Sequence, residues 1–207
     1  ELKTPIAIIK GELEGMIYQV GEYKDRDTYL RHCMKTVNDM ERIVKDILSA
    51  ARMGGSDFKL ERTDLDISRM LQKACRKVMG RIEDKEMELR QDIQPDFHYE
   101  GDARLMEKVF ANVLDNAVAY SPRGAVVTVT LQDGVLSVEN SGIHIEQEDL
   151  EQLFTPFYRV DKSRNRNSGG SGLGLYITKT ILDHHGISYS MENTENGVRF
   201  TALFRLL

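Results

Sequence analysis

Apolar residues recur in two regular runs over the first 51 residues, with spacings that alternate between three and four. The first run is Leu2, Ile6, Ile9, Leu13, Met16 and Val20. The second run is Leu30, Cys33, Val37, Met40, Val44, Ile47 and Ala51, and a polar break over residues 21–27 separates the two. This spacing is that of heptad a and d positions, so each run predicts a helix with one narrow apolar seam. Two such helices joined by a short turn predict an antiparallel hairpin.

The margins of this seam carry further apolar residues, which a hairpin standing alone would expose. They are Ile8, Ile17, Met34 and Ile43. Pairing two hairpins into a four-helix bundle would cover them, so we expect a homodimer. The alternative is that the hairpin packs on the rest of its own chain.

Residues 54–57 contain Gly54-Gly55 and form the linker that divides the chain into a helical hairpin, residues 1–53, and a second domain, residues 58–207. In the second domain the pattern predicts strands over 58–67, 87–93, 126–131, 135–140, 187–193 and 198–206. It predicts helices over 68–85, 102–120 and 173–185, the last of them ending at Gly186. Asp133-Gly134 predicts a tight hairpin turn. The expected fold class is therefore α+β: the hairpin, then an α/β sandwich whose largely antiparallel sheet carries helices on one face.

Two polar segments in the second domain are candidates for a binding site. Asn112 and Asn116 lie four residues apart and so share one face of the predicted helix, where an amide oxygen could ligate Mg²⁺. Residues 140–145, Asn-Ser-Gly-Ile-His-Ile, follow directly after a predicted strand, and glycine there allows close approach of a ligand. Each segment alone is also compatible with ordinary surface polarity or a plain turn.

A glycine-rich segment over residues 169–175 runs directly into a predicted helix. Free N–H groups at a helix start can cradle phosphate. Basic residues precede the segment: Arg159, Lys162, Arg164 and Arg166. The spacing matches neither the P-loop nor the dinucleotide fingerprint, so a different kind of phosphate site is expected.

Composition narrows the possible functions. A net charge of -5 argues against direct nucleic-acid binding, and the two cysteines form no disulfide framework. The histidines have no partners at metal-ligand spacing. No apolar run approaches the ~20 residues of a membrane span, and no signal-peptide pattern opens the chain. Because the chain starts with Glu1 rather than Met, we expect it to be a fragment.

In this order, the segments resemble the sensor histidine kinases of bacterial two-component systems. Residues 1–5, Glu-Leu-Lys-Thr-Pro, resemble the phosphoacceptor box His-Glu-Leu-Lys-Thr-Pro; residues 112–120 resemble the N box and residues 140–145 the first glycine box. Residues 153–159 resemble the F box and residues 170–175 the second glycine box. The chain is most similar to Gram-positive kinases that partner winged-helix response regulators, and its Asn-Ala-Val-Ala-Tyr-Ser and Glu-Asn-Ser-Gly forms resemble the vancomycin-resistance type.

The resemblance implies an ATP-binding domain of the histidine kinase, chaperone and topoisomerase kind, with ATP and Mg²⁺ as cofactors. The implied nucleotide contacts are Asn112, Asn116, Tyr120, Asn140, Gly142, Ile145, Phe157, Lys162, Gly170, Gly172, Leu173, Gly174 and Leu175, with Asn116 as the metal ligand. Glu1 would polarise the acceptor histidine, Thr4 would position water for dephosphorylation, and Arg159 would stabilise the transferring phosphoryl group.

The sequence departs from the family pattern at several positions. The acceptor histidine is expected immediately before Glu1 and is absent here, so the fragment as written could not phosphorylate itself. Asn140 stands where the family has an adenine-reading Asp, which predicts weaker ATP binding because the hydrogen bond loses its charge assistance. Ala119 replaces the usual N-box Lys, and His144 replaces the second glycine of its box.

The resemblance therefore implies the cytoplasmic kinase core of a membrane sensor kinase. It would phosphorylate its own histidine, pass the group to a response regulator and also dephosphorylate that partner. One alternative is a degenerate nucleotide-binding dimeric scaffold without kinase activity, which the Asn140 and Ala119 departures favour. Another is an ATPase of the chaperone or topoisomerase kind, against which the heptad hairpin argues.

Overall fold

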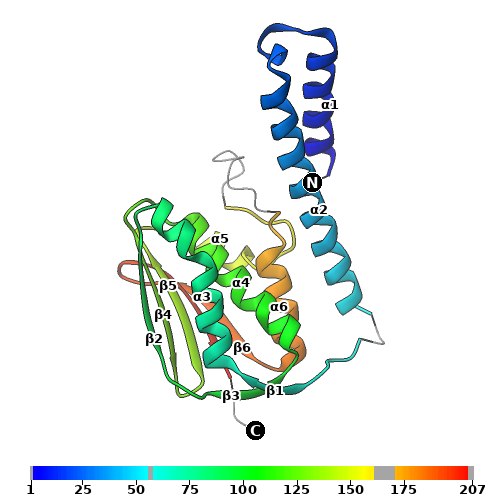
Figure 1. The fold of residues 1–207 in the computed structure, drawn as a ribbon. Coiled ribbons are helices and arrows are strands. Elements are labelled where there is room, and N and C mark those ends of the chain that lie inside the picture. Colours follow the sequence, from blue (N-terminus) through cyan, green and yellow to red (C-terminus); the bar gives the residue numbers. More distant parts are fainter. Residues whose placement is uncertain (1, 56–57, 161–170, 205–207) are drawn as a thin grey trace.

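The computed structural model describes residues 2–55, 58–160 and 171–204. It begins with a helical hairpin of α1 (Lys3–Tyr18) and α2 (Arg26–Met53), joined through a short 3₁₀ helix at Gly21–Lys24. Figure 1 shows this hairpin standing clear of the remainder of the chain at its upper end. The predicted pair of helices with a break between them is thus present.

Local chemistry explains where the two hairpin helices meet. Helix α1 ends where Gln19 adopts φ 53 and its N–H bonds to the carbonyl of Gly15. Gly15 is required there, because a Cβ would lie 2.5 Å from the ring of Tyr23 in the turn. Helix α2 is capped by Asp25, whose carboxylate accepts a hydrogen bond from the N–H of Thr28 at 3.3 Å. The turn therefore stacks tightly on the end of α1.

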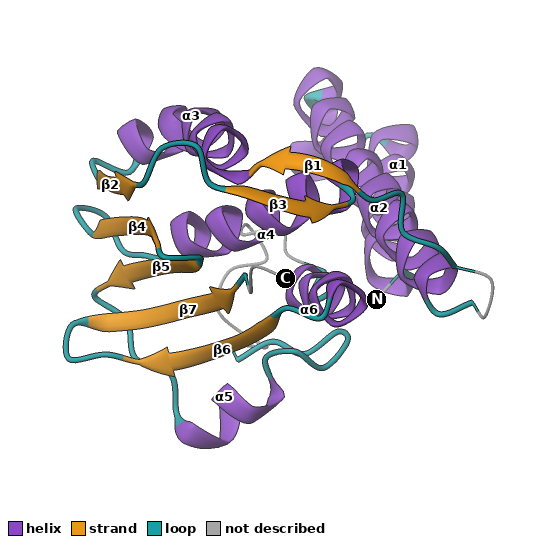
Figure 2. Cartoon of the chain, turned by 90° about the horizontal axis from the view of Figure 1, so that it is seen from below, coloured by secondary structure: helices purple, strands orange, loops and turns teal. Residues whose placement is uncertain are grey.

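Within residues 58–160 and 171–204, a five-stranded sheet packs against three long helices. The sheet has the order β2 (Glu88–Ile93), β4 (Val126–Gln132), β5 (Val135–Ser141), β7 (Gly197–Leu203) and β6 (Ser188–Asn193). Only the β2–β4 pair is parallel. Helices α3 (Ile67–Asp84), α4 (Ala103–Tyr120) and α6 (Gly174–His185) lie together on one side of it (Figure 2). The predicted α+β fold, with a largely antiparallel sheet covered on one face, is confirmed.

Three short elements differ from the prediction. The strand predicted over residues 58–67 is only β1 (Thr63–Asp66), and its antiparallel partner β3 (His98–Gly101) was not predicted. Helix α5 (Gln147–Gln152) was not predicted either. Both missed elements are too short to show a period: β3 spans four residues, and α5 is a six-residue segment that is polar at nearly every position.

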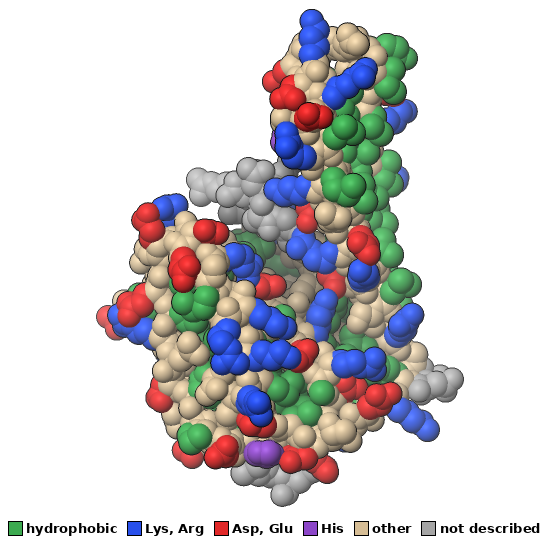
Figure 3. Space-filling model, in the orientation of Figure 1, with side chains coloured by type: hydrophobic (Ala, Val, Ile, Leu, Met, Phe, Trp, Pro, Cys, Tyr) green, Lys and Arg blue, Asp and Glu red, His purple; other side chains and the backbone are tan. Residues whose placement is uncertain are grey.

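The apolar seam of the hairpin is buried at its lower end, where α2 adjoins the sandwich, and exposed at its upper end, near the turn between α1 and α2. Met53 is 2% exposed and belongs to the same core as the sandwich, and Lys108 of α4 pairs with the buried Asp46 of α2 at 2.6 Å. Higher up, Ile17 is 67% exposed and Met34 60%. Ile8 is also exposed as expected, whereas Ile43 is half-buried. Figure 3 shows hydrophobic side chains along one edge of the hairpin. Packing against the described residues of the same chain therefore covers only the lower part of the seam.

His185 fixes the end of α6 against the start of α4. Its Nδ1–H donates to the carbonyl of Ile181 at 2.7 Å, and Nε2 accepts from the N–H of Asp102 at 3.0 Å. Burial lowers the pKa of His185, which favours the neutral ring that this pairing requires. Asp102 in turn caps α4 by accepting from Arg104 and Leu105. The two helices that carry most of the candidate site are thereby held in one arrangement.

Candidate functional site

The two asparagines of α4 lie one turn apart and have different surroundings. Asn112 Nδ2 donates to the carbonyl of Gly174 at 2.9 Å and lies 3.4 Å from Thr178 Oγ1, so it ties α4 to the first turn of α6. Asn116 is half-buried, and its side chain makes no hydrogen bond to any of the described residues. The amide of Asn112 therefore links α4 to α6, while the amide of Asn116 is available to a ligand.

The start of α6 presents unpaired backbone donors. Leu173 occupies the N-cap position without a side-chain cap, so N–H groups of the first turn lack side-chain partners among the described residues. Ser171 Oγ accepts instead from the N–H of Leu173, at 3.3 Å. The positive end of the helix dipole lies here as well, which favours an anionic group.

Gly172 joins the start of α6 to the segment before the undescribed residues. It has φ +70, and its carbonyl accepts from the N–H of Phe157 at 3.0 Å. A Cβ at Gly172 would lie 2.8 Å from the carbonyl carbon of Phe157 and 2.9 Å from the carbonyl oxygen of Tyr158. Phe157 itself has φ 64 and an exposed side chain. The backbone at Gly172 is in direct contact with the backbone of Phe157 and Tyr158, so only glycine, which has no Cβ, fits at position 172.

Tyr158 anchors the segment that carries Arg159. Tyr158 donates a hydrogen bond from its hydroxyl to Asp149 of α5, and this bond raises the pKa of Tyr158. Arg159 follows, half-buried, with no hydrogen-bond or ion-pair partner among the described residues. Its guanidinium is therefore not committed elsewhere in that part of the fold.

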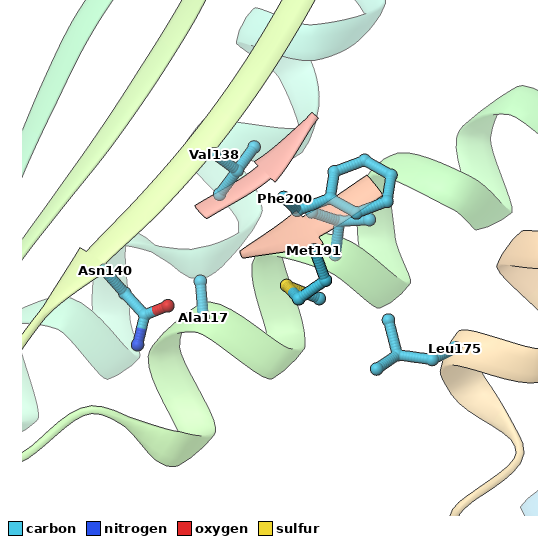
Figure 4. A pocket seen from close by; sticks show the side chains of 7 residues that line it. Ala117, Val138, Asn140, Leu175, Met191 and Phe200 are labelled. Carbon is cyan, nitrogen blue, oxygen red and sulfur yellow. The ribbon is translucent and has the colours of Figure 1, made fainter. Parts of the chain in front are cut away.

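A small apolar pocket, partly open to solvent, lies between α4, the sheet and the start of α6. Its lining consists of Val113, Ala117, Val138, Asn140, Leu175, Met191 and Phe200 (Figure 4). Asn140 is the polar member of this set and is only 6% exposed. A mostly apolar pocket with one oriented polar group is typical of a small-molecule site.

The turn that follows β5 is held on both sides. Gly142 has φ +82 and packs on Pro122, whose Cγ would lie 2.9 Å from a Cβ at that position. Asn193 of β6 accepts from the N–H of Ile145 at 3.0 Å and donates to its carbonyl at 2.7 Å. The side-chain amide thus substitutes for a strand partner and fixes Ile145.

The end of α4 is capped by a residue that the sequence did not single out. Lys85 Nζ donates to the carbonyls of Val118, Ala119 and Ser121 at 2.8, 2.9 and 3.0 Å. Partial burial lowers the pKa of Lys85. Tyr120, the last residue of α4, is 50% exposed beside this cap. Nothing in the spacing of Lys85 indicates this role, because its three acceptors lie more than 30 residues away.

The structure thus gathers Asn112, Asn116, Asn140 and the segment from Gly172 to Leu175 around α4 and the start of α6. Thr4 is exposed on α1 in the hairpin, on a different element. Glu1, Lys162, Arg164, Arg166, Gly169 and Gly170 lie outside the described residues.

In the part of the chain that the structure describes, neither a carboxylate–histidine metal centre nor a membrane-spanning helix is present. Over residues 2–55, 58–160 and 171–204, no group of three or more His, Cys, Asp and Glu side chains could hold a metal ion. Within the same residues, no helix is long and apolar enough to cross a membrane.

Comparison with known proteins gives concordant matches. Residues 101–207 match the family model described as "Histidine kinase-, DNA gyrase B-, and HSP90-like ATPase". The sensor protein VanSB of Enterococcus faecalis is 37% identical over 97% of this chain, and the chain spans 46% of that protein.

Two solved structures share the whole arrangement. The Acinetobacter baumannii histidine kinase AdeS superposes with a TM-score of 0.80 over 100% of this chain and 98% of its own, at 22% identity, which shows the fold alone. The histidine kinase ThkA, solved in complex with the response regulator protein TrrA, matches with a TM-score of 0.77 at 25% identity, covering 98% of this chain and 57% of that one. The chain therefore belongs to the histidine kinase-, DNA gyrase B- and HSP90-like ATPases and, within them, is related to the sensor histidine kinases.

Proposed function

We propose that the chain is the kinase core of a sensor histidine kinase that transfers the γ-phosphoryl group of ATP to a histidine immediately before Glu1. One observation carries the proposal: Asn112 ties α4 to the uncapped start of α6, and Asn116 on the same face of α4 has no partner among the described residues. This arrangement offers backbone donors for phosphate and an amide oxygen for a cation at one place.

The adenine ring would occupy the apolar pocket, with Asn140 accepting from its amino group, and Gly142, Ile145 and Tyr120 would border it. The phosphates would lie at residues 172–175, at the first turn of α6, where Gly172 and Gly174 let the backbone approach closely. Phe157, Lys162 and Gly170 complete the proposed nucleotide contacts. Bound Mg²⁺ would be held by Asn116 and would neutralise phosphate charge during transfer. Arg159, unpaired among the described residues, would stabilise the transferring group.

Glu1 would act as the carboxylate beside the acceptor imidazole, and Thr4 would position the water that dephosphorylates a response regulator. The protein partner of this kinase core would be a response regulator, as ThkA is bound to one in its solved complex. VanSB, of which the chain spans 46%, is named a sensor protein, so we place this core on the cytoplasmic side of a membrane protein whose membrane segments lie upstream.

The open upper seam of the hairpin supports a homodimer. The exposed apolar side chains there include Ile17, Leu30, Met34 and Val37. Pairing two hairpins would bury them in a four-helix bundle. Sedimentation equilibrium at micromolar concentration is expected to give twice the 23.6 kDa chain mass, and Met34→Glu is expected to give a monomer. A monomer for the unchanged protein would rule the bundle out.

The kinase proposal is tested with the chain extended by one histidine before Glu1. Incubation with γ-³²P-ATP and Mg²⁺ is expected to give a protein-bound label that is lost in acid and kept in base, as a phosphohistidine is. The matched control carries glutamine in place of the added histidine and should remain unlabelled. Addition of a response regulator should remove the label from the kinase, and subsequent loss of the regulator's phosphate would reveal phosphatase activity.

A second candidate is a degenerate nucleotide-binding scaffold, which Asn140 and Ala119 favour because each departs from the family pattern. That reading predicts that ATP binds to the extended dimer without any histidine label. The same experiment therefore separates the two functions.

A further inference from the structure

Asn140 lies at the base of the apolar pocket and is held by a serine from the end of α4. Its Nδ2 donates to Ser121 Oγ at 3.0 Å, and Ser121 is itself 4% exposed. Ser121 Oγ donates to the carbonyl of Ala117 at 2.6 Å. These contacts form a short chain from the helix backbone to the side chain that faces the pocket.

The donor and acceptor roles in these two hydrogen bonds follow from the carbonyl of Ala117, at which they end. The carbonyl of Ala117 can only accept, so the single proton of the Ser121 hydroxyl is committed to it. The hydroxyl oxygen can then only accept from Asn140, and the amide must turn its Nδ2 toward Ser121. Oδ1 is left facing the other lining residues, and Figure 4 shows the oxygen of Asn140 on the side of Ala117 and the nitrogen turned away. No described residue donates to that oxygen.

We propose that Ser121 sets the base selectivity of the site by locking the Asn140 amide with its oxygen toward the pocket. The proposal rests on the nucleotide site proposed above. Adenine carries an amino donor at C6, whereas hypoxanthine and guanine carry a carbonyl acceptor there. A freely rotating asparagine could serve either base, because its amide offers both a donor and an acceptor. The locked amide presents an acceptor alone, as a carboxylate would, and so favours adenine.

Lys85 strengthens this lock from the opposite side. Its ammonium group holds the carbonyl of Ser121 together with those of Val118 and Ala119, so the backbone that carries the hydroxyl cannot drift from the last turn of α4. Ser121 is accordingly a positioning residue: it acts on the base through Asn140.

The test compares binding of ATP and ITP by titration calorimetry with Mg²⁺. The two bases differ at C6, which carries an amino group or a carbonyl, and at the neighbouring N1, which accepts in adenine and donates in hypoxanthine. The unchanged protein is expected to prefer ATP by roughly 10-fold to 100-fold, the penalty for opposing two acceptors in a buried site. Ser121→Ala frees the amide to rotate, so the ratio of the two affinities is expected to fall toward one, mainly through tighter ITP binding.

Ser68→Ala is the matched control. Ser68 is 3% exposed and its hydroxyl also makes two hydrogen bonds, to the carbonyl of Gln94 at 2.7 Å and from the N–H of Phe97 at 3.0 Å, but neither of these partners lines the pocket, whereas Ser121 bonds to Asn140, which does. This variant should lose a similar amount of stability and keep the ATP:ITP ratio. If Ser121 had a purely structural role, Ser121→Ala and Ser68→Ala would have the same effect on the ATP:ITP ratio.

The decisive experiment repeats Ser121→Ala in a protein that also carries Asn140→Asp. A carboxylate has no donor to turn toward the base, so Ser121→Ala should no longer change the ratio in this background. The proposal is overturned if Ser121→Ala binds ATP with its preference intact, if it binds neither nucleotide while Ser68→Ala binds both, or if the ratio shifts equally with Asp at position 140. Failure of the unchanged protein to bind either nucleotide would instead overturn the ATP site itself.

Discussion

Replacing Asn116 by alanine is expected to lower the rate of ATP-dependent histidine phosphorylation roughly 100-fold to 1,000-fold, as removal of one pre-arranged charge-stabilising contact typically does. The amide makes no hydrogen bond to the described part of the fold, so its loss should change the free energy of unfolding by less than about 0.5 kcal/mol. The measurements are the initial rate of labelling in the histidine-extended chain and the thermal midpoint of unfolding.

The effect should depend on the cation. Mg²⁺ should tighten ATP binding to the unchanged chain, and this gain over EDTA should disappear in Asn116→Ala, because the proposed protein ligand is gone. Full labelling by Asn116→Ala, or an unchanged Mg²⁺ gain, would contradict the assignment of Asn116 as the metal ligand.

Asn112→Ala is the matched comparison on the same helix face. Asn112 donates to the carbonyl of Gly174, so its removal should cost about 1 kcal/mol of stability as well as activity. The two variants therefore separate a ligand contact from a contact that holds α4 and α6 together. Equal destabilisation by both would show that Asn116 also supports the fold.

The sequence predicted the long elements well, because each carries a regular period of apolar residues over several turns or strand residues. The heptads of α1 and α2 and the amphipathic pattern of α4 extend over several turns, and the Asp133-Gly134 turn fixes the β4–β5 hairpin with φ 50 and φ 75. Strand β3 and helix α5 are too short to carry a pattern and form only against neighbouring elements. Likewise, the lower part of α2 is buried by α4 and α6, a contact that heptads alone do not specify.

The sequence could single out those members of the candidate site that follow one another closely in the chain. The four-residue spacing of Asn112 and Asn116 places both on one helix face, and the glycine-rich pattern of residues 169–175 predicts a close backbone approach, which the structure has at Gly172. Ser121, Lys85 and Asn193 were missed, because each acts through a hydrogen bond to a residue distant in sequence or through a helix end. A serine before proline or a lysine at a helix end is common, so neither position stands out until the fold brings its partner near.

The site depends on α4 and α6 keeping one relative position, and the structure ties them at both ends. His185 joins the end of α6 to the start of α4, and Asn112 joins the middle of α4 to the start of α6. The short segment from Ser171 to Leu173, which enters α6, is held to Phe157 through Gly172 rather than by the core. A change at Gly172 should therefore act on the ligand more than on the core.

Gly172→Ala is expected to weaken ATP binding roughly 5-fold to 100-fold, which corresponds to about 1–3 kcal/mol of backbone strain. Alanine at φ +70 is disfavoured, and its Cβ would lie within 3.0 Å of three backbone atoms of Phe157 and Tyr158, which no side-chain rotation relieves. The free protein can escape the strain by separating the two segments. ATP would then have to restore the contact, so the strain appears as lost affinity in calorimetric titration.

Gly186→Ala provides the control for the backbone conformation alone. Gly186 has the same φ of +70, but nothing lies within 4 Å of the position where its Cβ would be. It ends α6 at the opposite side from the ligand, so alanine there should lower the free energy of unfolding by about 1–2 kcal/mol and leave ATP affinity unchanged. If both variants lost affinity equally, the strain of α6 as a whole would be responsible. If neither did, the contact between Gly172 and Phe157 would have no part in binding, and the phosphates would have to be held by other groups.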